Sequence, residues 1–281
     1  MGHLRPPPVT DTLITFPAPH ILLVTLNRPK KHNSITHGMN WEFDALWQWF
    51  DEQPSLRVAV ITGSGQKAFC AGSDLIEIEE AQKAKLLGGD GPELAKHAHP
   101  PSGFGGFSRR RGKKPVLAAV NGLALGGGFE IVLNCDITVA SPKASFGLPE
   151  ILVGVYAYGG GLPRLVQTVG LQAASEIALT GRRVSAKEAL DLRLIGKIAM
   201  SPETVLEETL ELAKKLAANS PDGIIVTRAA LREAWETASV ERAFQITHDQ
   251  MYDKLMKSEN SKEGLAAFRE KRSAKWTDSK L

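Results

Sequence analysis

Short apolar runs that end at a glycine or a polar turn restrict the architectures open to this chain. The runs RVAVITG (57–63), KPVLAAVNG (114–122) and DITVAS (136–141) have the length and residue types of buried strands. Helical patterns lie between them, as at 39–52, where the apolar residues at helical spacing are Trp41, Phe43, Leu46, Trp47 and Phe50. Strands that alternate with helices predict an α/β fold with a mostly parallel sheet.

The two ends of the chain have a different character. Residues 12–26 predict two short strands joined by a turn, and residues 144–150 predict an extended segment. Residues 77–113 are the least regular part, so we expect a long surface loop with a helix near a ligand there. After about residue 159 the pattern becomes helical, with helices expected over 160–169, 171–179, 186–193, 202–218 and, in at least two pieces, 221–257.

Composition excludes several classes of protein. The 281 residues are 43% hydrophobic and carry a net charge of +3, which argues against a protein that coats nucleic acid. No apolar stretch reaches the ~18 residues that a membrane span needs, so we expect no membrane insertion. Cys70 and Cys135 match no metal or redox spacing, and His97 and His99 have no acidic or cysteine neighbours. We therefore expect reduced thiols, a histidine-bearing surface loop and no metal.

Three consecutive glycines, Gly126–Gly128, stand before Glu130 in the run AVNGLALGGGFEI (119–131). Glycine costs ~0.5–1 kcal/mol relative to alanine in a regular element, so such a run needs a physical reason. Two explanations are open from this motif alone. The glycines either expose backbone amides at a helix start to bind a ligand, or allow a helix to pack closely on a sheet. The spacing matches neither a dinucleotide fingerprint nor a P-loop.

A second loop favours the ligand-binding explanation. The segment AFCAGSDL (68–75) follows the strand at 57–63, and ligands of open α/β sheets gather at the carboxyl ends of strands. Two such loops can each donate one amide to the same oxygen. Two carboxyl groups follow, Glu130 and Glu150, and a pair of carboxyls in a dry pocket suits acid–base chemistry. A glutamate inside GGGFEIVL needs such a role, because an unpaired buried carboxylate is costly.

Together these residues resemble a known superfamily. Between about residues 10 and 276 the chain carries, in order, LNRPKKHNSI, KAFCAGSDL, KPVLAAVNGLALGGGFEIVLNCDI, ASFGLPEILVG, TGRRVSAKEALDLRLI and EGLAAFREKR. This series resembles the enoyl-CoA hydratase/isomerase (crotonase) superfamily, in its hydratase type with two glutamates. The resemblance implies a spiral of ββα repeats (10–200) followed by a helical trimerisation region (201–276), and a homotrimer or a dimer of trimers. It also implies an acyl-CoA substrate, with coenzyme A as part of the substrate and no other cofactor.

The resemblance also implies roles for individual residues. The amides of Ser73 and Gly127 would hold the thioester oxygen, and Glu130 and Glu150 would flank one water and move its protons. Such backbone donors are worth about 2.7–4 kcal/mol each in comparable oxyanion holes. The residues implied in binding the substrate and its coenzyme A are Arg28, Lys30, Ala71, Ser73, Asp74, Leu75, Ile76, Gly127, Tyr156, Tyr158, Phe268 and Lys271, of which Phe268 and Lys271 would reach a neighbouring subunit's ligand.

The chain departs from the family pattern after the second glutamate. In GVYAYGGGLPRL (154–165), Ala157 replaces a proline and Tyr158 replaces a glycine, and Ile76 stands where some relatives carry lysine. Tyr156 and Tyr158 therefore either bind a polar acyl group or fill volume in the acyl pocket. The departure puts the identity of the substrate in doubt and leaves the reaction class unchanged.

Three alternative functions and one targeting signal complete the predictions from the sequence. An isomerase of the same fold is the nearest rival to enoyl-CoA hydration, but isomerases often use one carboxylate. A specialised acyl-CoA of siderophore or toxin metabolism is the second alternative, and RNA binding through RRRGKK (109–114) is a minor one. The last residues, Ser279–Leu281 within the tail 277–281, match a signal for the peroxisomal import receptor, so we expect a peroxisomal location.

Overall fold

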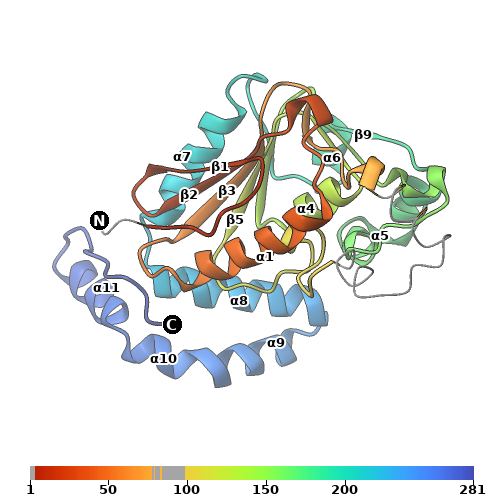
Figure 1. Cartoon of the computed structure of the whole chain (residues 1–281). Coiled ribbons are helices and arrows are strands. Elements are labelled where there is room, and N and C mark those ends of the chain that lie inside the picture. The colour runs from red at the N-terminus through yellow and green to blue at the C-terminus, as the bar shows by residue number, and fades with distance from the viewer. Residues whose placement is uncertain (1–3, 78, 80–82, 84–98) are drawn as a thin grey trace.

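The computed structural model describes residues 4–77, 79, 83 and 99–281, and its strands form two sheets (Figure 1). One sheet has the order β1-β2-β3-β5-β7-β10 and the other the order β4-β6-β8-β9. The hairpin β1–β2 and the pair β8–β9 are antiparallel, and all other neighbouring strands are parallel. The strands are β1 Thr12–Ala18, β2 Ile21–Leu26, β3 Val58–Gly63, β4 Ala68–Cys70, β5 Val116–Val120, β6 Leu123–Leu125, β7 Ile137–Ala140, β8 Ser145–Gly147, β9 Val184–Ser185 and β10 Lys197–Ile198.

Successive pairs of strands build both sheets at once. β3, β5 and β7 are neighbours in the larger sheet, while β4, β6 and β8, which follow them in the chain, are neighbours in the smaller sheet. Helix α4 (Gly127–Asn134) follows β6, and helix α5 (Gly161–Thr180) follows β8 after a 3-10 turn, η3 (Pro149–Val153). The chain thus repeats a strand–strand–helix unit and advances by one strand each time. This is the spiral of ββα repeats that the sequence led us to expect.

Burial on both faces explains why the central strands show no alternation. Every residue of β3 and β5 is buried, as expected for parallel strands covered on two sides. Helix α1 (His37–Glu52) packs Phe43 and Trp47 into one core cluster, and α7 (Val205–Ala217) covers the other face of the large sheet. α1 begins at Thr36, whose hydroxyl accepts a hydrogen bond from the Met39 amide at 3.3 Å. Trp41, which we expected on the buried face, is 44% exposed.

The helical part of the chain matches the expected segments closely. Gly170 interrupts α5 with a φ of +79°, at the break predicted between 169 and 171. The later helices are α6 Ala186–Asp191, α8 Pro221–Thr237, α9 Val240–Thr247, a π-helix His248–Tyr252, α10 Asp253–Lys257 and α11 Glu259–Arg269. In Figure 1, α6 lies near β9, α8 lies below the core, and the chain from α9 to α11 runs away from α5.

Much of the segment 100–110 is buried, which corrects the expectation of a surface loop for the described end of 77–113, while residues 78, 80–82 and 84–98 lie outside the described residues. The 3-10 turn η2 (Phe104–Gly106) packs on α1, and Ser108 is completely buried. In the basic run, Arg110 is 6% exposed and pairs with Asp51 at 2.7 Å, and Lys114 donates to two backbone carbonyls of the 50–53 segment. These cations hold α1 against the core, so they are not part of an RNA-binding patch.

The last residues of the chain lie against the body. The Asn260 side chain exchanges hydrogen bonds with the backbone of Thr277, at 2.9 and 3.1 Å. Ser279 donates to Asp222, and the Lys113 ammonium donates to the Leu281 carbonyl at 2.6 Å. The tail is therefore attached at several points. Among the described helices, none has the length and apolar character to cross a bilayer.

Candidate active site

The three glycines each serve a different packing need at the start of α4. Gly126 has a φ of +54°, and a methyl group in place of its hydrogen would lie 2.9 Å from Oε1 of Glu150. A methyl group on Gly127 would overlap the Phe104 ring, and one on Gly128 would overlap the backbone carbonyl of Cys70. The close-packing explanation is therefore confirmed, and the same packing holds the amide of Gly127 at the helix start, where ligand binding stays a prediction.

Two backbone amides meet at this helix start. Ile35 accepts from the Asp74 amide and donates to the Gly72 carbonyl, so Ser73 between them directs its own amide away from Ile35. A methyl group on Gly72 would lie 3.3 Å from the nitrogen of Gly127, which places the two loops side by side. Neither amide, Ser73 or Gly127, donates to another residue of the described chain. The pair can hold an oxygen that gains negative charge.

Glu130 lies on the first turn of α4 and is 3% exposed. Its Oε1 accepts a hydrogen bond from the Gly161 amide at 2.8 Å, and Gly159 packs directly against the carboxyl group. Burial raises the pKa of Glu130, and the neighbouring amides and two arginines offset this only in part. A buried carboxyl with a raised pKa holds its proton more tightly than an exposed one, a property that suits general acid–base catalysis.

Glu150 begins the turn η3 and faces the same space. Its Oε1 lies against Gly126, and its Oε2 is buried without a hydrogen-bond partner in the described part of the chain. Burial, together with the charge of Glu130, raises the pKa of Glu150 to about 7. The charge of Glu130 acts on Glu150 because the two carboxyl groups lie in the same part of the structure. The structure therefore brings Glu130 and Glu150 together beside the amide of Gly127.

The raised pKa of Glu150 predicts that the stability of the folded chain depends on pH. The folded chain binds the Glu150 proton more tightly than the unfolded chain, so the free energy of unfolding falls as pH rises from about 4.5 to about 7. We expect a fall of ~2–3 kcal/mol from this group. Glu150→Gln removes the titrating proton and flattens the slope of stability against pH, which urea unfolding between pH 4.5 and 8 measures. An unchanged slope in the variant contradicts the assignment.

The predicted coenzyme A residues fall into two groups. Arg28 pairs with Asp74 at 2.8 Å and donates to the Ser34 carbonyl at 2.9 Å, so it ties the turn after β2 to the loop after β4. The pKa of Asp74 is lowered because Arg28 outweighs the effect of burial. We conclude that Arg28 and Asp74 fix the shape of this edge. The side chains that remain exposed there are Lys30, Leu75 and Ile76, while Ala71 is half-buried.

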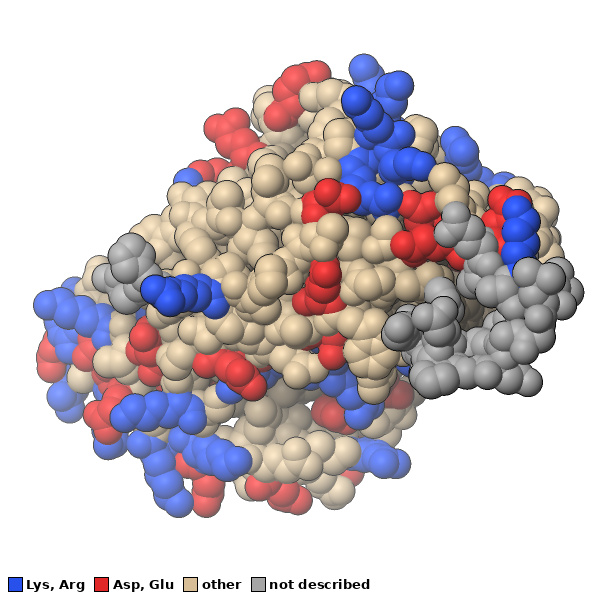
Figure 2. All heavy atoms as spheres, in the orientation of Figure 1, with Lys and Arg blue, Asp and Glu red and all other residues tan. Residues whose placement is uncertain are grey.

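Charge on the molecular surface agrees with a local basic site. On the face drawn in Figure 2, acidic and basic side chains are interspersed along the lower helices, while basic side chains gather at the top.

Phe268 and Lys271 lie at the end of α11, on the opposite side of Figure 1 from α5. Within one chain they do not reach Glu130 or Glu150. Phe268 is 88% exposed, so its role toward a neighbouring subunit remains a prediction.

The acyl side of the site contains residues that the sequence analysis missed. His99 was predicted to lie in a surface loop, but it stacks on Tyr158 with ring centroids 4.9 Å apart. Its predicted companion His97 lies outside the described residues. Phe104 contacts both His99 and Gly127. No spacing rule marks this cluster in the sequence, because the segments that meet there are 20 to 60 positions apart in a chain with no repeat to relate them.

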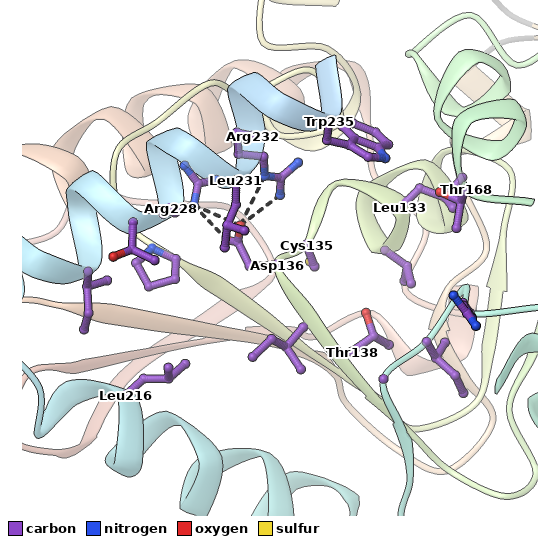
Figure 3. Close-up of a pocket in the computed structure, with 18 of the residues that line it drawn as sticks. Leu133, Cys135, Asp136, Thr138, Thr168, Leu216, Arg228, Leu231, Arg232 and Trp235 are labelled. Atoms are coloured by element: carbon purple, nitrogen blue, oxygen red, sulfur yellow. Dashed lines mark hydrogen bonds and ion pairs between the residues drawn. The ribbon is translucent and has the colours of Figure 1, made fainter. Parts of the chain in front are cut away.

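A separate cavity lies behind the large sheet. A cavity of about 910 Å³ is bounded by β7, α7 and α8, and Figure 3 shows Arg228 and Arg232 pointing from α8 to Asp136 inside it. Arg228 pairs with Asp136 at 2.9 Å, and Arg232 pairs with the same carboxylate at 3.0 Å. The acid is thus fully paired, and neither Glu130 nor Glu150 lines this cavity. Among the described residues, no three His, Cys, Asp or Glu side chains are grouped as a metal site.

Comparison with known proteins decides the family. A family model described as enoyl-CoA hydratase/isomerase matches residues 18–279. The chain belongs to the enoyl-CoA hydratase/isomerase family. It is 49% identical to a mevalonyl-coenzyme A hydratase of Beauveria bassiana over 278 residues, covering 99% of this chain and 98% of the relative. A mevalonyl-coenzyme A hydratase of Aspergillus fumigatus is 48% identical, with 98% of each chain covered.

Solved structures of the enoyl-CoA hydratase/isomerase family confirm the fold. The crystal structure of an enoyl-CoA hydratase from Mycobacterium tuberculosis H37Rv superposes with a TM-score of 0.83 at 32% identity. The match covers 96% of this chain and 99% of that one. The crotonase-type α/β fold with C-terminal helices, predicted from the sequence motifs, is therefore correct.

Proposed function

We propose that this enzyme adds water reversibly across the C2–C3 double bond of a 2-enoyl-CoA thioester. The observation that supports this is the buried Glu130 and the half-buried Glu150 beside the amides of Ser73 and Gly127, which donate to no other residue of the described chain. One carboxylate accepts a proton from water as its oxygen bonds to C3. The C2–C3 electron pair shifts toward the thioester oxygen, which the two amides stabilise. The partner carboxylic acid then gives a proton to C2, and the thioester carbonyl is restored.

We further propose an acyl group of the mevalonyl type. The two mevalonyl-coenzyme A hydratases match almost the whole chain at 48–49% identity. A mevalonyl thioester has hydroxyl groups on C3 and C5 and a methyl branch at C3, and loss of the C3 hydroxyl as water gives the 2-enoyl form. Such a group is not a straight-chain fatty acid, which supports a place in specialised metabolism, of the siderophore kind, over fatty-acid degradation.

A substrate panel tests the proposal. The purified enzyme is incubated with crotonyl-CoA, a long straight-chain 2-enoyl-CoA and 5-hydroxy-3-methylpent-2-enoyl-CoA, and the loss of enoyl thioester absorbance is followed. We expect the highest kcat/KM with the branched, hydroxylated thioester. If crotonyl-CoA is preferred, the substrate assignment is wrong while the reaction class stands. Migration of the 2-enoyl double bond to C3, without water addition, in any of these assays supports the isomerase instead.

We propose that the enzyme assembles as a homotrimer or a dimer of trimers through its C-terminal helices. Large apolar side chains are exposed there, a common property of surfaces that meet a partner. The exposed fractions lie between 60% and 88% for Leu231, Val240, Phe244, Leu265 and Phe268. Light scattering of the purified enzyme gives its mass in solution, and a monomer at all concentrations contradicts this assembly.

We propose a peroxisomal location, supported by the terminal Ser-Lys-Leu. A receptor that reads these residues must compete with the contacts of Ser279 to Asp222 and of Leu281 to Lys113. Deleting Ser279–Leu281 from a fluorescent fusion, with the fluorophore at the N-terminus, is expected to leave it in the cytosol. Punctate fluorescence that persists after the deletion removes the tail as the signal.

A further inference from the structure

A stacked pair of rings stands on the acyl side of the site, and the water-addition mechanism does not use it. The rings of Tyr158 and His99 are nearly parallel, at 13°, and Tyr158 Oη lies 3.4 Å from His99 Nε2. The other ring nitrogen of His99, Nδ1, is buried and has no hydrogen-bond partner in the described part of the chain. A buried polar atom without a partner is costly, so its retention suggests a partner that arrives with the ligand.

Contacts place this pair within reach of the reacting carbons. Phe104 packs on Gly127, and His99 meets the Phe104 ring edge-on with centroids 5.6 Å apart. On the other side, Gly159, which directly follows Tyr158, packs against the carboxyl group of Glu130. The contacts therefore form an arc from the amide of Gly127 to the carboxyl of Glu130. An acyl chain with its carbonyl at Gly127 and its C3 at the glutamates extends toward the rings that complete the arc.

The two rings are polar but uncharged near neutral pH. Burial lowers the pKa of His99 to about 4, with smaller effects from His37 and Arg109, so its imidazole carries one donor and one acceptor. Burial and the charge of Glu130 raise the pKa of Tyr158, so its phenol keeps its proton. An uncharged donor–acceptor pair beside two carboxyl groups suits a hydroxyl group. A carboxylate at the same place would be repelled by Glu130 and Glu150.

We propose that Tyr158 and His99 together bind a hydroxyl group at the far end of the acyl chain and thereby select a hydroxylated substrate. The inference rests on the proposed water addition, because that reaction orients the acyl chain. In a mevalonyl-type thioester this hydroxyl is on C5, two carbons beyond the carbon that receives water. Tyr158 stands where the family pattern has glycine, so this chain has a phenol at a position where that pattern has no side chain.

The test uses three substrates with the same branched carbon skeleton. They are 3-methylpent-2-enoyl-CoA, 5-hydroxy-3-methylpent-2-enoyl-CoA and 3-methylglutaconyl-CoA, which end in a methyl group, a hydroxyl group and a carboxylate. We expect the parent enzyme to prefer the hydroxyl form in kcat/KM. Tyr158→Phe removes one oxygen and keeps the ring, and His99→Phe keeps the stack. Each is expected to lower the hydroxyl-to-methyl ratio of kcat/KM about tenfold, the usual size of one lost hydrogen bond.

The chain provides a matched control. His248 and Tyr252 stack in the C-terminal helices with centroids 4.8 Å apart at 15°, almost the same geometry. Tyr252→Phe and His248→Phe are expected to keep the ratio within about twofold of the parent value. Thermal unfolding of each variant verifies that the protein is folded before its kinetics are compared.

The possible outcomes separate the two proposals. A parent enzyme that hydrates these thioesters, but whose ratio is unchanged in both Tyr158→Phe and His99→Phe, overturns this inference and leaves the proposed function intact. A parent enzyme that prefers 3-methylglutaconyl-CoA overturns it in favour of an acidic acyl end. If the parent hydrates none of the three and no other 2-enoyl-CoA, the proposed function fails and this inference fails with it.

Discussion

Glu130→Gln and Glu150→Gln each lower kcat for water addition by at least ~100-fold, the lower end of what one acid–base group contributes. Glutamine keeps the size of the side chain but can neither accept nor release the proton that water addition moves. Glu130 is held by the Gly161 amide at 2.8 Å, and Glu150 has a pKa of about 7, so both are suited to exchange a proton in turnover. The assay is the loss of enoyl thioester absorbance under saturating substrate.

A matched change elsewhere shows whether the effect belongs to the site. Glu211 is an exposed glutamate that pairs with Lys214 on α7, and Glu211→Gln should leave kcat unaltered. Binding of a non-reactive acyl-CoA separates loss of chemistry from loss of the substrate site. Full turnover in Glu130→Gln or in Glu150→Gln, with the fold intact, excludes that residue from the proton transfers.

Asp136→Ala destabilises the folded chain by about 3–5 kcal/mol, because it leaves the buried Arg228 and the half-buried Arg232 without their shared acid. The Arg228, Arg232 and Asp136 side chains are 10%, 20% and 16% exposed, and the acid joins α8 to the start of β7 (Figure 3). Burial raises the pKa of Asp136, but the two arginines outweigh it and the pKa is lowered. The contribution is therefore present at pH 7 and is lost as pH falls below the ordinary value of 3.8.

Urea unfolding at pH 7 measures the difference, and an exposed ion pair supplies the comparison. Asp191 pairs with Lys187 on α6, where the two side chains are 58% and 77% exposed. Asp191→Ala is expected to cost less than ~1 kcal/mol. If Asp136→Ala is as mild as Asp191→Ala, the three charges do not hold α8 to the sheet in solution.

Much of the fold can be predicted from local patterns in the sequence. The strands β3, β5 and β7 follow from apolar runs of strand length, and the break in α5 follows from one glycine at position 170. The glycine triplet and Glu130 mark the helix start that carries the site. These features depend on neighbours in the chain, so a reading of the sequence finds them.

The errors arise where distant segments meet. The run 109–114 is basic in sequence, yet Arg110 is neutralised by Asp51, almost 60 positions earlier on α1. Arg28 is paired with Asp74, and its role toward coenzyme A stays a prediction. His99 was expected at the surface but lies against Tyr158. In each case the charge or polarity of the side chain suggests that it is exposed to solvent, but a partner far away in the sequence offsets the cost of burying it.

The spiral topology has a consequence for how such chemistry can diverge. Ser73 follows the strands of one repeat, Gly127 and Glu130 open the helix of the next, and Glu150 follows the strands of the third. The two amides proposed to hold the carbonyl oxygen, together with Glu130, can thus be kept while substitutions in the third repeat alone change Glu150 or the aromatic side chains of that repeat. A scaffold arranged in this way permits stepwise changes in the proton-transfer residues and in the preferred acyl group, without loss of thioester binding.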